Sequence, residues 1–167
     1  MEIVNRANLK NPNDKLGMLL EVAVVEALKS NQLYVVRTSQ FNEFYQQDRS
    51  KGPDVIFEFD DKKTGVIECK NVNDDFVIYE DWFKTHVDDR FFPMYKDVDL
   101  HIVVMSRFTP SSRELAREIR NRYRIFSVGF QVVNQETYEK AVPIIAKDLL
   151  IVTEWLKRYP SDAKKGI

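Results

Sequence analysis

The chain has 167 residues, of which 44% are hydrophobic and 31% are charged, and its formal net charge is −1. These values are typical of a single folded domain with a sizeable core, and they exclude a disordered chain. The single cysteine excludes an internal disulfide and a cysteine-rich zinc site, and no apolar run reaches the length of about eighteen residues that a membrane span needs.

Residues 1–13 form a polar lead-in and do not begin a signal peptide, so we expect a cytoplasmic protein with no membrane partner. Asp14 is expected to cap a helix over 15–30, because aspartate is a favoured N-cap and an apolar periodic segment follows it. Glu21 lies in an apolar row of this helix, where a carboxylate without a partner would be costly to bury. We therefore expect Glu21 to face a polar site, the alternative being that its side chain extends to the surface.

A hairpin is predicted in the first half of the chain, with strands over 55–59 and 66–69 joined by a polar turn. Asp54 directly precedes the first of these strands. Because side chains alternate along a strand, Glu68 and Lys70 point to the same side of the second strand. Two opposite charges at the end of a half-buried strand need a polar cleft or a ligand.

If Asp54 lies across from Glu68 and Lys70, two carboxylates and one ammonium converge on a small volume. Mg²⁺ takes oxygen ligands and is commonly held by one or two carboxylates together with water and substrate phosphate oxygens. A nearby ammonium can orient an attacking water or offset charge in the transition state. The pattern therefore predicts metal-dependent hydrolysis of a phosphodiester, with an ion pair on a solvated face as the alternative.

Pro53-Asp54, followed fourteen positions later by Glu68-Cys69-Lys70, resembles the PD-(D/E)xK nuclease superfamily, which includes restriction endonucleases and archaeal Holliday junction resolvases. The resemblance implies that Asp54 and Glu68 are metal ligands and that Lys70 is the catalytic lysine. It implies the backbone carbonyl of Cys69 as a further ligand. The implied cofactor is Mg²⁺, for which Mn²⁺ can substitute, and no nucleotide cofactor is expected.

Two other features acquire a role through this resemblance. Gly17 and Glu21 are similar to the first helix of archaeal resolvases, in which a helical glutamate faces the active site. Arg49 and Lys51 lie in a polar loop over 39–51, and related nucleases often place a DNA-contacting loop at this point. The two residues are therefore candidate phosphate contacts, although a merely solvated loop explains them equally well.

An arginine-rich helix is expected over 112–124, capped by Thr109 or Ser111. Four of its arginines recur on one side within a sector about 60° wide. They could lie along a phosphate backbone, or they could form an ordinary helix surface paired with neighbouring glutamates, and the spacing favours neither. The four are Arg113, Arg117, Arg120 and Arg124.

The remaining elements complete an alternating pattern of strands and helices. We assign no role to His86 or His101. The last helix carries an apolar row, Ile145, Leu149, Val152 and Leu156, which predicts packing on the sheet or against a second copy of the chain. The expected elements are strands over 33–38, 76–79, 100–105 and 126–133, the last with a bulge at Gly129, an irregular helix over 80–92 ended by Pro93, and a helix from 135 to 159 interrupted by Pro143.

This order of elements predicts one α/β domain over 14–159, a three-layer sandwich with a central mixed β-sheet flanked by helices, and a tail over 160–167. The resemblance implies a restriction endonuclease-like fold and a Mg²⁺-dependent DNA endonuclease. A Holliday junction resolvase is the alternative among enzymes, and it would be a homodimer because a four-way junction offers two related strands. A non-catalytic nucleic-acid-binding module on the same fold is the alternative that is not an enzyme.

Overall fold

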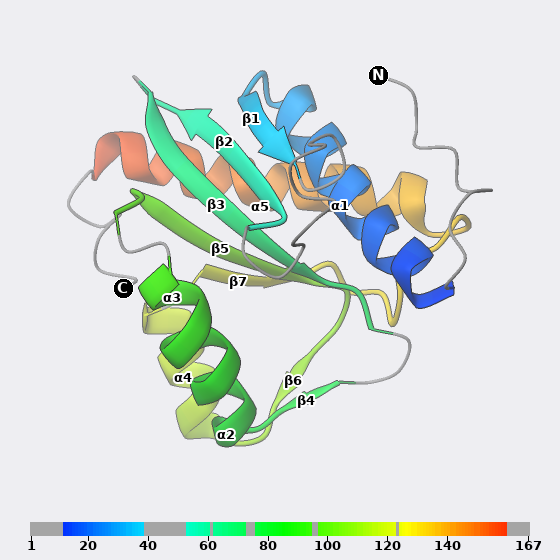
Figure 1. Cartoon of the computed structure of the whole chain (residues 1–167), viewed down its shortest axis with the longest axis vertical. Helices are drawn as coiled ribbons and strands as arrows, with labels where there is room; N and C mark the ends of the chain where they lie inside the picture. Colours follow the sequence, from blue (N-terminus) through cyan, green and yellow to red (C-terminus); the bar gives the residue numbers. More distant parts are fainter. Residues whose placement is uncertain are drawn as a thin grey trace.

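A five-stranded β-sheet with helices on both faces forms the centre of the molecule (Figure 1). The computed structural model describes residues 12–38, 53–60, 62–72, 76–94, 97–122 and 124–159. The first three strands in the sheet are antiparallel and the last two run parallel to the third, so the expected α/β class with a mixed sheet is confirmed. In spatial order the strands are β1 (Tyr34–Thr38), β2 (Val55–Phe59), β3 (Lys63–Lys70), β5 (Leu100–Met105) and β7 (Arg124–Ser127).

The predicted hairpin is present, and its second strand begins earlier than expected. β2 and β3 pair in the register that sets Val55 opposite Ile67. The connecting turn is short: Asp60 and Lys62 have positive φ angles of 38° and 72°, and the Lys63 N–H donates to the Asp60 carbonyl at 3.3 Å. The left-handed backbone at these two positions lets the chain reverse within a few residues.

Phe57 and Gly65 face each other across this hairpin. A Cβ atom at position 65 would lie 2.5 Å from two ring carbons of Phe57, a distance that real Cβ contacts do not show. Phe57 is fully buried, so its ring has no free space into which it could move. Only glycine fits at position 65 while the ring keeps its place.

Helical crossovers connect the parallel strands, as parallel pairing requires. Between β3 and β5 the chain forms β4 (Val77–Ile78), α2 (Glu80–Phe83), the π-helix η3 (Lys84–Phe91) and α3 (Phe92–Met94). Between β5 and β7 it forms β6 (Thr109–Pro110), which pairs with β4 in a separate small sheet, and α4 (Arg113–Arg122). The irregular helix predicted over 80–92 is confirmed, and the irregular part is the π-helix.

Alternation along the strands divides the apolar side chains between two clusters, one on each face of the sheet. Ile67 and Ile102 pack on the face covered by α1 (Pro12–Ser30) and α5 (Tyr138–Arg158) (Figure 1). Val66 and Val103 pack on the opposite face with residues of α2, η3 and α4. The row predicted for the last helix lies in the first cluster and packs within the chain: Ile145, Leu149, Val152 and Leu156.

The structure corrects three predicted helix boundaries that involve Asp14, Pro143 and Pro93. α1 begins at Pro12, so Asp14 lies inside its first turn and is not the N-cap; proline is tolerated there because the first N–H groups of a helix have no intrahelical partner. α5 continues unbroken through Pro143. Pro143 is exposed, so water can bond the Glu139 carbonyl that loses its intrahelical donor. Pro93 lies inside α3 and does not terminate the preceding helix.

The boundaries of α4 also correct the sequence analysis. Its cap is Ser112, whose Oγ accepts a hydrogen bond from the Leu115 N–H at 3.1 Å, and neither Thr109 nor Ser111 has this role. The helix ends at Arg122, and Arg124 is the first residue of β7, where it pairs with Ile102. Helical spacing therefore does not apply to Arg124.

The last strand is shorter than the predicted strand over 126–133. β7 ends at Ser127, whose Oγ accepts a hydrogen bond from the Gly129 N–H at 3.2 Å. Gly129 has a positive φ of 79° and lies outside the strand, so it forms a turn and the expected bulge was wrong.

Candidate active site

The open end of the hairpin brings two carboxylates together. Continuing the β2–β3 register by one residue beyond Val55 and Ile67 sets Asp54 opposite Glu68. The Cys69 N–H donates a hydrogen bond of 2.7 Å to Oδ2 of Asp54. The backbone of β3 therefore holds the Asp54 carboxyl at the end of the sheet, although Asp54 itself precedes the strand.

Lys70 shares the side of β3 on which Glu68 lies. Its Nζ is 3.7 Å from Oε1 of Glu68, and the two side chains are 39% and 27% exposed. The pair is thus accessible from one side, and at this distance the ammonium is available to another negatively charged group. Both side chains are half-buried, and an N–O distance of 3.7 Å makes this a loose ion pair.

Glu21 reaches the same point from α1. The side chain of Glu21 lies within hydrogen-bonding reach of the Asp54 carboxyl, and this contact lowers the pKa of Asp54. Burial is the largest cause of the raised pKa of the Cys69 thiol. The neighbouring charges of Asp54, Glu21 and Glu68 raise this pKa further. Three acidic groups from three elements therefore surround one backbone segment.

Burial raises the pKa of both Asp54 and Glu68. For Asp54 the increase is opposed by the Cys69 N–H, by the Lys70 ammonium and by the hydrogen bond from Glu21. For Glu68, burial and the neighbouring charge of Asp54 raise the pKa to about 7, against the attraction of Lys70 and Arg90. Carboxyls with strongly raised pKa values in a cluster of like charge are typical of functional sites, because an added cation would relieve the repulsion.

Two residues at the site were missed by the sequence analysis. Arg90, from η3, lies near enough to Glu68 to favour its charged form. Asn71 fastens the segment after Lys70: its Nδ2 donates to the Val133 carbonyl and its Oδ1 accepts from the Val133 N–H, both at 2.8 Å. Neither contact can be predicted from the sequence around Arg90 or Asn71, because each joins residues that are distant in the sequence.

Ser106 makes a second connection behind the site. Its N–H donates to the Lys70 carbonyl at 3.0 Å, and its buried Oγ accepts from the Val72 N–H at 2.9 Å. The same hydroxyl lies 3.2 Å from the Gln131 carbonyl. The backbone at Lys70 and just after it is therefore held to the residue that follows β5, which fixes the position of the lysine backbone.

Two carboxylates and a backbone carbonyl suit a hard divalent cation. Among the residues that the structure describes, no group of three or more His, Cys, Asp or Glu side chains has the arrangement of a metal site. Mg²⁺ does not need one, since it keeps several waters and takes one or two carboxylates together with phosphate oxygens. The oxygens of Asp54, Glu68 and the Cys69 carbonyl fit that requirement, and their crowding supplies the negative potential.

Unlike the carboxylates, the residues predicted to contact nucleic acid do not come together at one place in the described structure. Arg49 and Lys51 lie outside the described residues. The exposed arginines of α4 point away from Leu115 and Ile119, which are buried against the sheet, whereas Arg124 is half-buried in β7. Within the described chain, the cations that lower the pKa of Glu68 are Lys70 and Arg90, neither of which belongs to the predicted row. The exposed members of that row are Arg113, Arg117 and Arg120.

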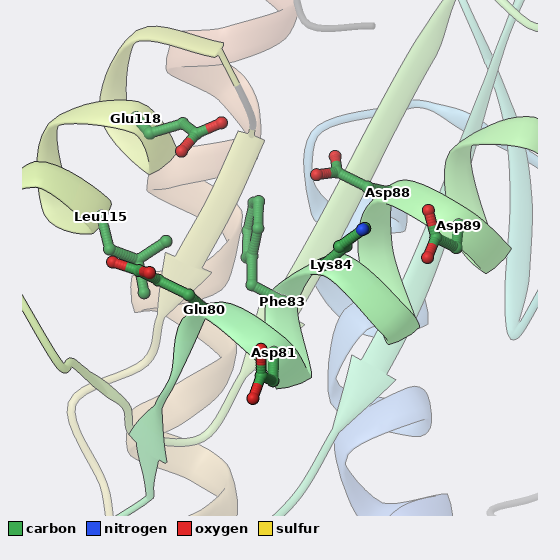
Figure 2. A pocket seen from close by; sticks show the side chains of 8 residues that line it. All are labelled: Glu80, Asp81, Phe83, Lys84, Asp88, Asp89, Leu115 and Glu118. Atoms are coloured by element: carbon green, nitrogen blue, oxygen red, sulfur yellow. The ribbon is translucent and has the colours of Figure 1, made fainter.

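A second concentration of acidic side chains surrounds a hollow of about 370 Å³ between α2, η3 and α4 (Figure 2). Figure 2 shows its carboxylates arranged around an opening next to the ring of Phe83. Negative charge on this scale repels a phosphate backbone, so this hollow does not suit a nucleic acid. The lining residues are Glu80, Asp81, Phe83, Lys84, Asp88, Asp89, Leu115 and Glu118.

No protein-family model, curated protein sequence or solved structure matches this chain. Among the described helices, none is both long and apolar enough to cross a membrane.

Proposed function

We propose that this chain is a Mg²⁺-dependent endonuclease that hydrolyses phosphodiester bonds in DNA on a restriction endonuclease-like fold. The observation that carries the proposal is the convergence of Glu21, Asp54, Glu68 and Lys70 at the open end of the β2–β3 hairpin. The order of helix, antiparallel strands, helix and parallel strand supports it, because it is the order that the PD-(D/E)xK resemblance implies.

Each residue has a role that follows from its position. Asp54 and Glu68 would hold the cation, with the Cys69 carbonyl as a further oxygen ligand. A bound Mg²⁺ lowers the pKa of a coordinated water and stabilises charge on the phosphate. Lys70 is accessible beside Glu68 and would orient the attacking water or neutralise a phosphate oxygen. Glu21, through its hydrogen bond, would position Asp54 and share its proton.

A Holliday junction resolvase is the second candidate. The contact between Glu21 and Asp54 favours it, because a helical glutamate at the active site is part of the resemblance to archaeal resolvases. Such an enzyme would act as a two-fold dimer and cut two related strands of a junction symmetrically. The two candidates share the same chemistry and differ in the preferred substrate.

The test is a cleavage assay on supercoiled plasmid and on a synthetic four-way junction, with Mg²⁺, Mn²⁺ or EDTA. We expect metal-dependent cutting that Glu68→Ala abolishes, and the preferred substrate decides between endonuclease and resolvase. Asp88→Ala, which removes a carboxylate from the hollow beside α4, is the control and should cut like the native chain.

Binding separates the enzyme from the non-catalytic alternative. Asp54→Asn should abolish cutting while leaving DNA affinity largely intact, as measured by fluorescence anisotropy with labelled duplex. Folded native protein that binds DNA but cuts neither substrate with either metal would overturn the proposal in favour of a binding module.

A further inference from the structure

The outer side of α5 and the residue that follows it carry large apolar side chains that the described part of the chain leaves partly exposed. Ile144, Ile151, Trp155 and Tyr159 are 40%, 57%, 50% and 50% exposed. Ile144, Ile151 and Trp155 are spaced by seven and four residues, which places them within a sector about 40° wide. Tyr159 directly follows the helix, and its ring lies 4.7 Å from that of Trp155. We call these four side chains the α5 stripe. Single exposed apolar residues are ordinary, but several on one side of a helix are typical of an interface. Asp148, which is half-buried, lies on the same side between Ile144 and Ile151, so the apolar contact is centred on Ile151, Trp155 and Tyr159.

The α5 stripe is separate from the side of α5 that packs in the core. The core side is formed by the row that includes Leu149 and Val152, which are 0% and 8% exposed. By helical spacing the two rows lie about a quarter turn apart, so the core row can stay on the sheet while the stripe contacts another surface. Covering the stripe therefore requires no change in the fold.

Charges along one edge of the stripe indicate what covers it. Lys147 and Glu154 lie on the same edge, two helical turns apart. When two copies of a helix pair antiparallel about a two-fold axis, the same edge of each copy comes together and the order of residues is reversed. An axis near residue 150 then places Lys147 of each copy beside Glu154 of the other. Parallel pairing about a two-fold axis would bring opposite edges together, so Lys147 and Glu154 would not meet.

We propose that α5 is a dimer interface, in which the α5 stripe packs against the α5 stripe of a second copy of this chain in antiparallel orientation. The self-complementary charge of Lys147 and Glu154 favours a second copy over an unrelated partner. Within one copy, Nζ of Lys157 donates a hydrogen bond of 2.9 Å to Oε1 of Glu154. Both side chains are exposed, so replacing this contact by one with Lys147 of the second copy costs little free energy. The interface does not use the carboxylate cluster, and the proposal therefore stands apart from the nuclease function.

The stripe is small compared with the interfaces of permanent dimers. Stable complexes bury about 1,600 Å² in total, and one row of four side chains on a single helix supplies less than that. We therefore expect a reversible dimer with a dissociation constant on the order of micromolar.

Sedimentation velocity of the full chain from about 1 to 300 μM tests the proposal. The native chain should shift from monomer to dimer with concentration, whereas Ile151→Glu and Trp155→Ala should weaken the dimer at least about tenfold. Leu150→Glu is the matched control, because Leu150 is 43% exposed on the same helix but lies outside the stripe. Native protein that stays monomeric throughout, or stripe variants that dimerise like Leu150→Glu, would overturn the proposal.

Charge reversal tests the orientation. Lys147→Glu and Glu154→Lys should each weaken self-association, and the double variant should restore it. Mixing the two single variants should give a heterodimer, because each reversed charge then meets its complement. Circular dichroism of every variant establishes that it is folded, and single reversals without effect in folded protein would rule out the antiparallel arrangement.

Discussion

Two regions of this protein concentrate negative charge, and they differ in how the carboxylates are held. At the end of the hairpin, Asp54 and Glu68 are fixed by strand register and by a backbone hydrogen bond, and burial raises the pKa of both. Around the hollow beside α4, most of the acidic side chains, such as Asp81 and Asp89, are exposed on helices. Confinement of the carboxylates, and not their number, therefore makes an acidic cluster suitable for chemistry.

The largest expected difference between the two regions concerns their lysines. Lys70→Met should reduce the cleavage rate about 10²–10³-fold, because an ammonium beside Glu68 is lost where charge develops on the phosphate. Lys84→Met, in the hollow, should leave the rate within about twofold of native. Single-turnover cleavage of plasmid with saturating Mg²⁺ measures both, and equal effects of the two variants would contradict the assignment.

Stability should respond to pH through Glu68, at the end of the hairpin. The pKa of Glu68 is raised from 4.5 to about 7, so folded protein keeps a proton that the unfolded chain releases. In metal-free protein, the free energy of unfolding should therefore fall as pH rises from about 4.5 to 7. Glu68→Gln should remove this decrease and stabilise the fold at pH 8 by about 2–3 kcal/mol, measured by urea denaturation in EDTA. Asp89→Asn, at an exposed position of the hollow, is the control and should change stability by less than about 0.5 kcal/mol.

A smaller effect is expected from the carboxylate that α1 contributes. Glu21→Gln keeps a hydrogen-bond donor beside Asp54, but the amide cannot lose a proton when a cation binds, so the Mg²⁺ concentration for half-maximal cleavage should rise about tenfold. Glu26→Gln, on the same helix, should leave it unchanged. An unaltered Mg²⁺ requirement in Glu21→Gln would mean that Glu21 does not support the cation site.

The smallest effect should come from neutralising the hollow. The double variant Asp81→Asn and Asp89→Asn should increase DNA affinity about twofold at low salt, because it removes long-range repulsion without adding a contact. The increase should disappear at about 0.2 M salt in an anisotropy titration. A gain above about tenfold would place the DNA against the hollow and would break the contrast between the two regions.

The layered fold and the core of the site could be predicted because their signals are local. Alternation along 55–59 and 66–69 predicts the hairpin, and the hairpin places Asp54 across from Glu68. The approach of Glu21 was foreseen from a carboxylate in an apolar helical row. These inferences need only the period of one element and the pairing of two neighbouring strands.

What could not be predicted depends on boundaries and on distant partners. The arginine spacing continues past the end of α4, and nothing local indicates that Arg124 belongs to a parallel strand. Arg90 comes near Glu68 through a crossover that contains a π-helix, whose residues do not follow helical spacing of 3.6. The tethers made by Ser106 and Asn71 join segments separated by 34 and 62 residues.

The contact between Phe57 and Gly65 lies several residues from any charged group of the site, yet it governs whether the site exists. A slip of one residue between β2 and β3 would put a side chain where the ring of Phe57 now lies, and it would also turn Glu68 to the opposite face of the sheet. A steric clash with the Phe57 ring therefore disfavours the shifted register. The close fit of the Phe57 ring against Gly65 therefore helps to set the strand register that aligns Asp54 with Glu68.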